Sequence, residues 1–122
     1  MNYVHIYADA SGETHIEDVV LALSPLPSDS PEAAIHLSAW RRADQLAFAR
    51  CLPGTDGAWQ TTPRRQFLFV LAGEVEIEVS DGTVRRVAAG ATLLFEDRTG
   101  KGHCAGFLGT EQVILALVEL PD

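Results

Sequence analysis

The sequence predicts an all-β domain, folded as a β-sandwich or a β-barrel. Short apolar or alternating stretches recur along the chain, and turn-forming Gly and Asp residues separate them. The clearest stretch is residues 74–79, Glu-Val-Glu-Ile-Glu-Val, in which acids alternate with apolar residues that one sheet face can bury. Asp81-Gly82 follows it and predicts a two-residue hairpin turn of type I′. These observations favour many short strands packed in one domain.

The N-terminal region predicts a β-hairpin followed by an irregular connection. Residues 3–7 and 15–21 each alternate in polarity, and the turn-like 9–12 lies between them. Residues 24–31, Ser-Pro-Leu-Pro-Ser-Asp-Ser-Pro, are too rich in proline for regular structure. We expect this segment to connect elements of one domain, because too little chain precedes it to form another.

Two patterns compete in the region that follows. Ser30-Pro-Glu is a good helix start, which favours a short helix over residues 32–42. The alternation over residues 45–52 predicts a strand instead, and Pro53-Gly54 ends it. The remaining strands are expected at residues 67–72, 74–79, 83–88, 92–95, 104–108 and 112–120.

Length and composition limit the class of protein. The 122 residues suit one domain, 1–122, with N-terminal strands at 1–23, the connection at 24–44 and a barrel core at 45–120. The net charge of −8 argues against binding to nucleic acid or anionic membranes. The first residues lack the basic start and apolar core that signal peptides have, and the sequence contains no long apolar run and no Cys-x-x-Cys pair, so we expect a cytoplasmic protein.

Two segments keep the spacing of a metal-binding motif without most of its ligands. The first segment runs from Gly54 to Gly73. It keeps the spacing of the pattern Gly, five residues, His-x-His, three or four residues, Glu, six residues, Gly, but not its His and Glu residues. Its three ligand positions hold Gln60, Thr62 and Gln66. The second segment runs from residue 90 to residue 107 and retains one familiar ligand, His103, after a loop two residues longer than usual.

The paired segments resemble the two motifs of the cupins, and the chain is similar to small bacterial cupins with an RmlC-like jelly roll. The resemblance covers residues 45–120 and implies a double-stranded β-helix, a cavity for a small molecule and, commonly, a homodimer. Cupins include oxygenases, isomerases, cyclases and non-catalytic sugar binders, so the fold by itself does not select an activity.

The resemblance, combined with the alternation of side chains along strands, predicts the lining of the cavity. If Gln66 points inward, Leu68 does too, and Glu96 and Asp97 cannot both enter because they are adjacent. Trp40 and Trp59 are candidates for the rim. The expected ligand-binding residues are Gln60, Thr62, Gln66, Leu68, Trp59 and Glu96, with His103 as the candidate catalytic residue.

The ligand positions predict no metal and no other cofactor. One histidine and two glutamines are a poor set for iron, zinc or nickel, which prefer three or four imidazole, thiolate or carboxylate ligands. The leading hypothesis is a metal-independent small-molecule protein in which His103 transfers a proton during isomerisation, cyclisation or elimination. The alternatives are a non-catalytic sensor with the same cavity and a metal-dependent oxygenase that uses His103 with nearby acids.

Overall fold

All regular structure in the described residues is β-strand. The computed structural model describes residues 1–26, 34–55 and 57–122. No helix in these ranges is long and apolar enough to span a membrane. The strands are β1 (Asn2–Ala8), β2 (Thr14–Val20), β3 (Ser24–Pro25), β4 (His36–Leu37), β5 (Gln45–Cys51), β6 (Gln66–Ala72), β7 (Glu74–Val79), β8 (Val84–Ala88), β9 (Thr92–Phe95), β10 (His103–Leu108) and β11 (Val113–Glu119).

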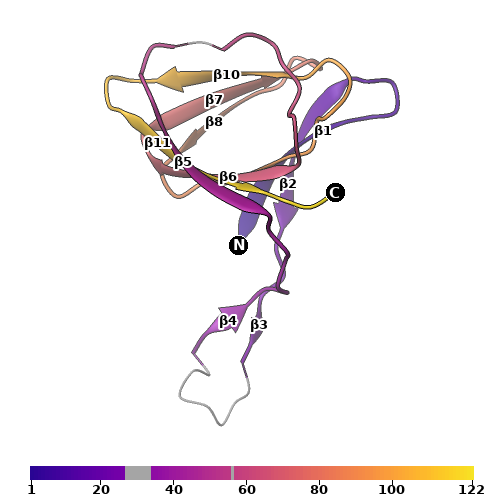
Figure 1. The fold of residues 1–122 in the computed structure, drawn as a ribbon, viewed down its shortest axis with the longest axis vertical. Coiled ribbons are helices and arrows are strands. Elements are labelled where there is room, and N and C mark those ends of the chain that lie inside the picture. The colour runs from indigo at the N-terminus through magenta and orange to yellow at the C-terminus, as the bar shows by residue number, and fades with distance from the viewer. Residues whose placement is uncertain (27–33, 56) are drawn as a thin grey trace.

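Two sheets face each other and form the barrel (Figure 1). The larger has six strands in the order β2-β1-β9-β6-β11-β5, and the smaller has three in the order β10-β7-β8. Neighbouring strands are antiparallel except β1 and β9, which pair in parallel. The N-terminal hairpin is therefore built into the larger sheet, next to the barrel core expected at residues 45–120.

The core lies between the two sheets, where the alternating side chains of both meet. Val75, Ile77 and Val79 of β7 are each 1% exposed, as the alternation of residues 74–79 predicts. From the larger sheet, Val70 and Leu93 pack in the same cluster. Burial of one face of each strand therefore fixes the pairing, because a shift by one residue would expose these side chains.

The hairpin between β7 and β8 differs from the expected type I′ turn. A type I′ turn needs a positive φ at both central residues. No residue other than glycine has a positive φ in the described ranges, and here only Gly82 does (+95°). The Gly82 amide donates to the Val79 carbonyl, so the turn centres on Ser80 and Asp81, with Gly82 in the left-handed position after it. This is the three-residue hairpin form with a glycine bulge.

The connection between the N-terminal hairpin and the barrel forms a projecting arm. Ser24–Pro25 pairs with His36–Leu37 as a minimal antiparallel hairpin, where the sequence favoured an irregular connection. Residues 27–33 lie outside the described ranges. The described part of the possible helix, 34–42, is not helical. Figure 1 shows the β3–β4 hairpin extending away from the barrel.

Candidate functional site

A buried polar cluster lies inside the barrel at the start of β10. It consists of Thr62, Asp97 and His103, which are 2%, 0% and 6% exposed. Thr62 Oγ1 donates to Asp97 Oδ1 (2.7 Å), and His103 Nδ1 lies 2.6 Å from Asp97 Oδ2. Both carboxylate oxygens of Asp97 are thus engaged by side chains. A buried carboxylate is costly unless it is paired in this way, so the three residues form one unit.

Backbone contacts between residues 54–62 and β10 position this cluster. Gln60 and His103 form a reciprocal pair of hydrogen bonds, each 2.9 Å. The Thr62 amide donates to the Asp97 carbonyl (3.0 Å). Gly102 makes the approach possible, because a Cβ at this position would overlap the Gln60 carbonyl. Its φ of +74° also favours glycine.

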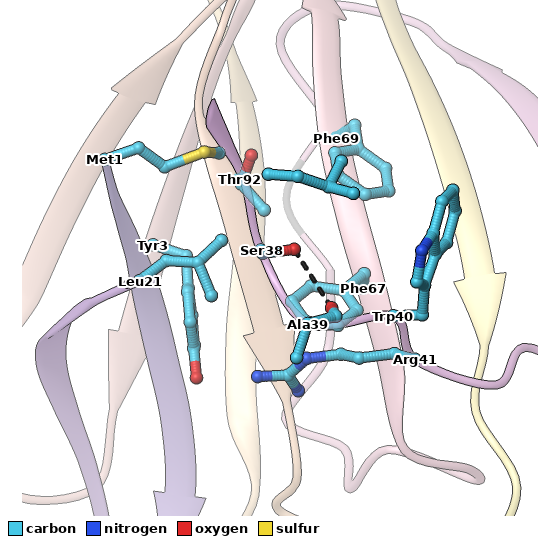
Figure 2. Close-up of a pocket in the computed structure, with 11 residues that line it drawn as sticks. Met1, Tyr3, Leu21, Ser38, Ala39, Trp40, Arg41, Phe67, Phe69 and Thr92 are labelled. Carbon is cyan, nitrogen blue, oxygen red and sulfur yellow. Dashed lines mark hydrogen bonds between the residues drawn. The ribbon is translucent and has the colours of Figure 1, made fainter. Parts of the chain in front are cut away.

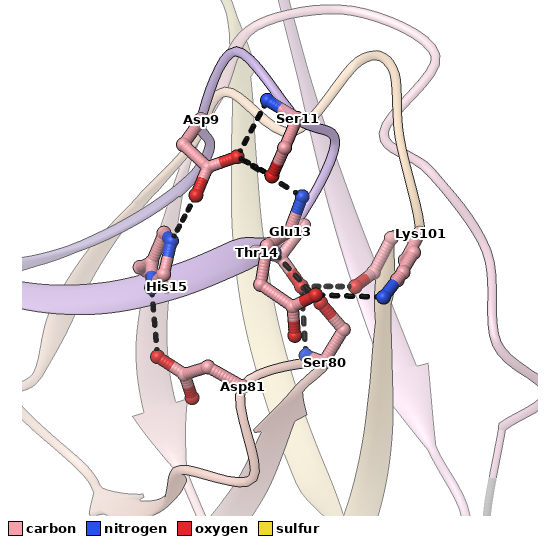
Figure 3. A network of polar contacts seen from close by, with 9 residues as sticks. Asp9, Ser11, Glu13, Thr14, His15, Ser80, Asp81 and Lys101 are labelled. Carbon is pink, nitrogen blue, oxygen red and sulfur yellow. Dashed lines mark hydrogen bonds and ion pairs between the residues drawn. The ribbon is translucent and has the colours of Figure 1, made fainter.

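A second polar network holds the loop that leads into β10 (Figure 3). Thr14 is fully buried, and its hydroxyl donates to the Gly102 carbonyl (2.7 Å). Its amide donates to Ser80 Oγ (2.7 Å). Lys101 Nζ pairs with Glu13 (2.7 Å). The network thus joins three segments that are distant in the sequence, around residues 13–14, 80 and 101–102, and it fixes the backbone just before His103.

His15 is part of the same network and lies between two carboxylates. Its Nε2 is 2.7 Å from Asp9 and its Nδ1 is 2.8 Å from Asp81. These hydrogen bonds raise the pKa of His15 above its usual 6.5, and the hydrogen bond to Asp9 is the larger cause. The hydrogen bond with His15 is also the main cause that lowers the pKa of Asp9. The pKa of Asp81 is lowered as well, mainly by Thr83.

We expect this corner to make stability depend on pH. A histidine whose folded pKa is raised contributes stability that is fully present below pH 6.5 and is lost as pH rises through the folded pKa. The two aspartates contribute stability that is present above pH 3.8 and is lost on acidification. In urea unfolding, wild type should therefore lose stability relative to a His15→Asn variant as pH rises from about 6 to 9.

The control is His36→Asn, which removes an exposed histidine on β4. This variant should follow wild type across the same pH range. A constant difference between wild type and His15→Asn would show that His15 stays in one protonation state and would contradict the prediction.

The two ring nitrogens of His103 differ in their contacts: Nδ1 contacts Asp97, and Nε2 does not. Because a carboxylate oxygen accepts hydrogen bonds, Nδ1 carries the hydrogen in its contact with Asp97. Nε2 has no hydrogen-bond partner in the described part of the chain, and it is not among the fully buried polar atoms that lack one. Phe95 packs against the ring, with centroids 4.8 Å apart. The arrangement holds the imidazole in one orientation, with Nδ1 directed at Asp97.

The barrel brings some of the predicted site residues together. Thr62 and His103 meet through Asp97. Gln66 is the strand partner of Phe95, so both face the interior, and Leu68 lies two residues along the same face in the core. Gln66 also lines a hollow of about 240 Å³ at the start of β6, with Gln45, Leu46, Ala47, Leu117 and Glu119.

Other predicted site residues lie apart from His103. Gln60 was expected with Thr62 in the lining of the cavity, yet it is exposed. The segment around it makes a single bridge to β10 and is not a regular strand, so strict alternation does not apply. Trp59 is 49% exposed and lines an outer hollow of about 340 Å³ near Lys101. Trp40, expected at the rim, is 87% exposed on the far side of the larger sheet.

Glu96 points away from the cluster and joins a different set of charges. It pairs with Arg65, and His5 Nε2 lies 2.7 Å from its other oxygen, although this approach is poorly aligned for a hydrogen bond. Asp97 occupies the interior position instead. The rule that adjacent strand residues face opposite sides predicted that at most one of the two acids would enter. The rule did not identify which one: Glu96 was expected among the ligand-binding residues, whereas Asp97 was not.

The donors around His103 do not fit a transition-metal site. A stable site needs three or four imidazole, thiolate or carboxylate ligands. In residues 1–26, 34–55 and 57–122, no three His, Cys, Asp or Glu side chains converge in such a group. His103 is joined only by Asp97, whose oxygens already accept from Thr62 and from His103 itself. Gln60, at the first ligand position of the motif, is exposed.

A separate apolar hollow of about 230 Å³ lies on the outer face of the larger sheet (Figure 2). Its aromatic wall is formed by Tyr3, Phe67 and Phe69, and residues 37–41 pass across it. The guanidinium of Arg41 lies over the rings of Tyr3 and Phe67, 5.9 and 5.3 Å from their centroids. This hollow is on the opposite side of the sheet from the His103 cluster.

Comparison with known proteins identifies the fold. No model of a known family matches the chain, and no curated protein matches it. A conserved protein with a double-stranded β-helix domain from Klebsiella pneumoniae matches with a TM-score of 0.51 and 27% identity, over 62% of this chain and 65% of that one. The cupin domain of Schizosaccharomyces pombe Cnp3 matches with a TM-score of 0.56 and 13% identity, over 99% of this chain and 88% of that one. The chain has the fold of these proteins, the double-stranded β-helix or cupin jelly roll.

The cupin fold explains why the site lies at the start of β10. The two motif segments, residues 54–73 and 90–107, meet inside the barrel through the bridge between Gln60 and His103. The chain spans just under two thirds of the Klebsiella pneumoniae protein. The likeness to the Schizosaccharomyces pombe domain, at 13% identity, shows the fold alone.

Proposed function

We propose that this cupin binds a small molecule inside its barrel without a metal ion, and that His103 transfers a proton to or from it. The observation that carries the proposal is the buried contact between His103 Nδ1 and Asp97 Oδ2 (2.6 Å), which leaves Nε2 available. A carboxylate that fixes the tautomer and stabilises the imidazolium is the established role of the acid in histidine-dependent catalysis.

The chemistry of these residues suits proton transfer at carbon or oxygen. Nε2 would accept a proton from the ligand, the positive charge would form beside Asp97, and the proton would return at another position. An isomerisation, a cyclisation or an elimination each needs such a group. The amide of Gln66 is the proposed donor to a carbonyl or hydroxyl of the ligand, and Leu68 and Phe95 supply apolar walls.

The test uses His103→Gln together with Gln60→Ala as a control whose exposed side chain lies outside the cluster. A library of small carbonyl and hydroxy compounds is screened by thermal shift. A ligand at about 100 times its dissociation constant stabilises the folded state by about 2.7 kcal/mol, which is easily detected. Hits should stabilise wild type and Gln60→Ala, and they should bind His103→Gln less well or without turnover.

Turnover is then measured as exchange of ligand C–H hydrogens in deuterated water, followed by NMR. Exchange in wild type that disappears in His103→Gln with binding retained supports proton transfer. Binding without exchange in wild type supports the second candidate, a non-catalytic ligand sensor. Stoichiometric iron, nickel or zinc in protein purified without added metal would overturn the metal-independent proposal and favour the third, a metal-dependent oxygenase.

The proposal includes a cytoplasmic protein that acts as a homodimer and does not bind nucleic acid. The net charge of −8 and the absence of a Cys-x-x-Cys pair support the location and the exclusion of nucleic acid.

A further inference from the structure

A second hollow adjoins the apolar hollow on the outer face of the larger sheet. It also has a volume of about 230 Å³, and it is lined by Arg41, Arg42, Arg65, Leu120 and Pro121. We call it the arginine hollow. Arg41 lines both hollows, so the two meet at its side chain. An apolar space thus opens beside three guanidinium groups in a chain whose net charge is −8.

Two of these three arginines have no acid to neutralise them. Arg65 pairs with Glu96. Neither Arg41 nor Arg42 forms an ion pair within residues 1–26, 34–55 and 57–122, and the nearby Asp44 pairs with Arg64 instead. Other basic side chains of the described chain do pair with acids: Arg85, Arg86, Arg98 and Lys101. Adjacent arginines left unpaired in an acidic protein create a local attraction for an anion.

Arg41 is placed to bind a carboxylate. Its guanidinium lies over the rings of Tyr3 and Phe67, 5.9 and 5.3 Å from their centroids. Contact with a ring occupies the flat face of a guanidinium, while its N–H groups point outward in the guanidinium plane. These N–H groups match the two oxygens of a carboxylate, which they can bind through a bidentate pair of hydrogen bonds.

The apolar hollow has the shape and lining for a flat ring (Figure 2). Tyr3 meets Phe67 edge to face with centroids 5.7 Å apart, and Phe69 stacks beside Phe67 with centroids 6.0 Å apart. Aromatic side chains arranged in this way offer both edges and faces to another ring. The volume of about 230 Å³ is below the roughly 300–1,000 Å³ of pockets for drug-sized ligands, so the ligand must be small.

We propose that the two hollows together bind a small aromatic carboxylate. Its ring lies against Tyr3, Phe67 and Phe69 in the apolar hollow, and its carboxylate lies with Arg41 and Arg42 in the arginine hollow. The site is on the opposite side of the sheet from His103. It is therefore separate from the ligand proposed for the barrel interior, and each proposal can fail without the other.

The experiment measures the binding of 2-naphthoate to the full chain by isothermal titration calorimetry. Wild type should bind it with a dissociation constant below about 1 mM. The neutral 2-naphthamide should bind at least about 10-fold more weakly, because it lacks the charge that pairs with a guanidinium. Decahydro-2-naphthoate keeps the carboxylate but not the flat rings, so it should also bind more weakly.

Arg41→Gln tests the contact with the carboxylate. It should raise the dissociation constant of 2-naphthoate at least about 10-fold and change that of 2-naphthamide much less. Arg50→Gln is the matched control, because Arg50 is also exposed but lines neither hollow. This variant should bind 2-naphthoate as wild type does. Both arginines are exposed, so the circular dichroism of both variants should be unchanged.

The amide signals in NMR spectra locate the bound probe. Adding 2-naphthoate should shift the signals of residues 37–41 and 67–69 and leave those of residues 102–104 in place. His103→Gln should bind the probe as wild type does. The proposal would be overturned by a wild type that fails to bind at about 5 mM, by unchanged binding to Arg41→Gln, or by shifts centred on His103. Equal affinity for 2-naphthamide would overturn the carboxylate contact, and equal affinity for decahydro-2-naphthoate would overturn the choice of an aromatic ligand.

Discussion

Replacing Asp97 with alanine is expected to lower the free energy of unfolding by about 3 kcal/mol, because two buried donors lose their acceptor. Thr62 Oγ1 and the His103 Nδ1–H group would be left without partners inside the barrel. Asp97→Asn should lose much less, since its amide can accept from His103 and donate to the Thr62 hydroxyl. Urea unfolding at one fixed protein concentration measures the free energy of unfolding of wild type, Asp97→Ala and Asp97→Asn.

The control for this prediction is Asp122→Ala. Asp122 is 68% exposed in its side chain and pairs with Arg98 at the surface. Exposed ion pairs contribute little, so the change should stay within about 0.5 kcal/mol of wild type. If Asp97→Ala were equally mild, the cluster would not be the coupled buried unit described above.

Gly102→Ala is expected to destabilise the protein by at least about 3 kcal/mol and to displace the start of β10. The φ of +74° disfavours alanine, and the added methyl group would overlap the Gln60 carbonyl. The bridge between Gln60 and His103 cannot form with that overlap, so the His103 ring should also lose its orientation. Thermal unfolding and the side-chain NMR signals of His103 report the two effects.

Gly82→Ala separates the two causes. Gly82 also has a positive φ, +95°, but a Cβ there would have no atom within 4 Å. Its alanine variant should therefore show only the backbone penalty, about 1 kcal/mol. If Gly82→Ala and Gly102→Ala lost the same free energy of unfolding, the overlap with the Gln60 carbonyl would contribute nothing to the destabilisation.

The strands were predictable because their signals are local. The alternation of residues 74–79 and 45–52 reports which side of each strand is buried, and the structure confirms β7 and β5 at these places. The spacing from Gly54 to Gly73 predicted the cupin fold, which the solved structures support. Turn details were less predictable, since Asp81-Gly82 fits two hairpin forms and the register of β7 with β8 decides between them.

The site was only partly predictable. His103 and Thr62 follow from the motif spacing, whereas Asp97 joins them across 6 and 35 residues of chain. The motif also placed Gln60 in the same ring. The chain there makes a single bridge and leaves its side chain exposed, so a motif spacing does not fix side-chain direction outside a regular strand.

The sequence by itself determined that this chain builds a β-barrel in which most metal-ligand positions hold neutral side chains. Alternation and residue type are properties of each segment, so they can be read without knowing what the segment touches. Only the tertiary structure decided that Asp97 pairs with His103, that Glu96 pairs with Arg65, and that the β3–β4 hairpin projects away from the barrel. These features depend on which distant segments meet, and burial of the two sheet faces against each other sets that choice.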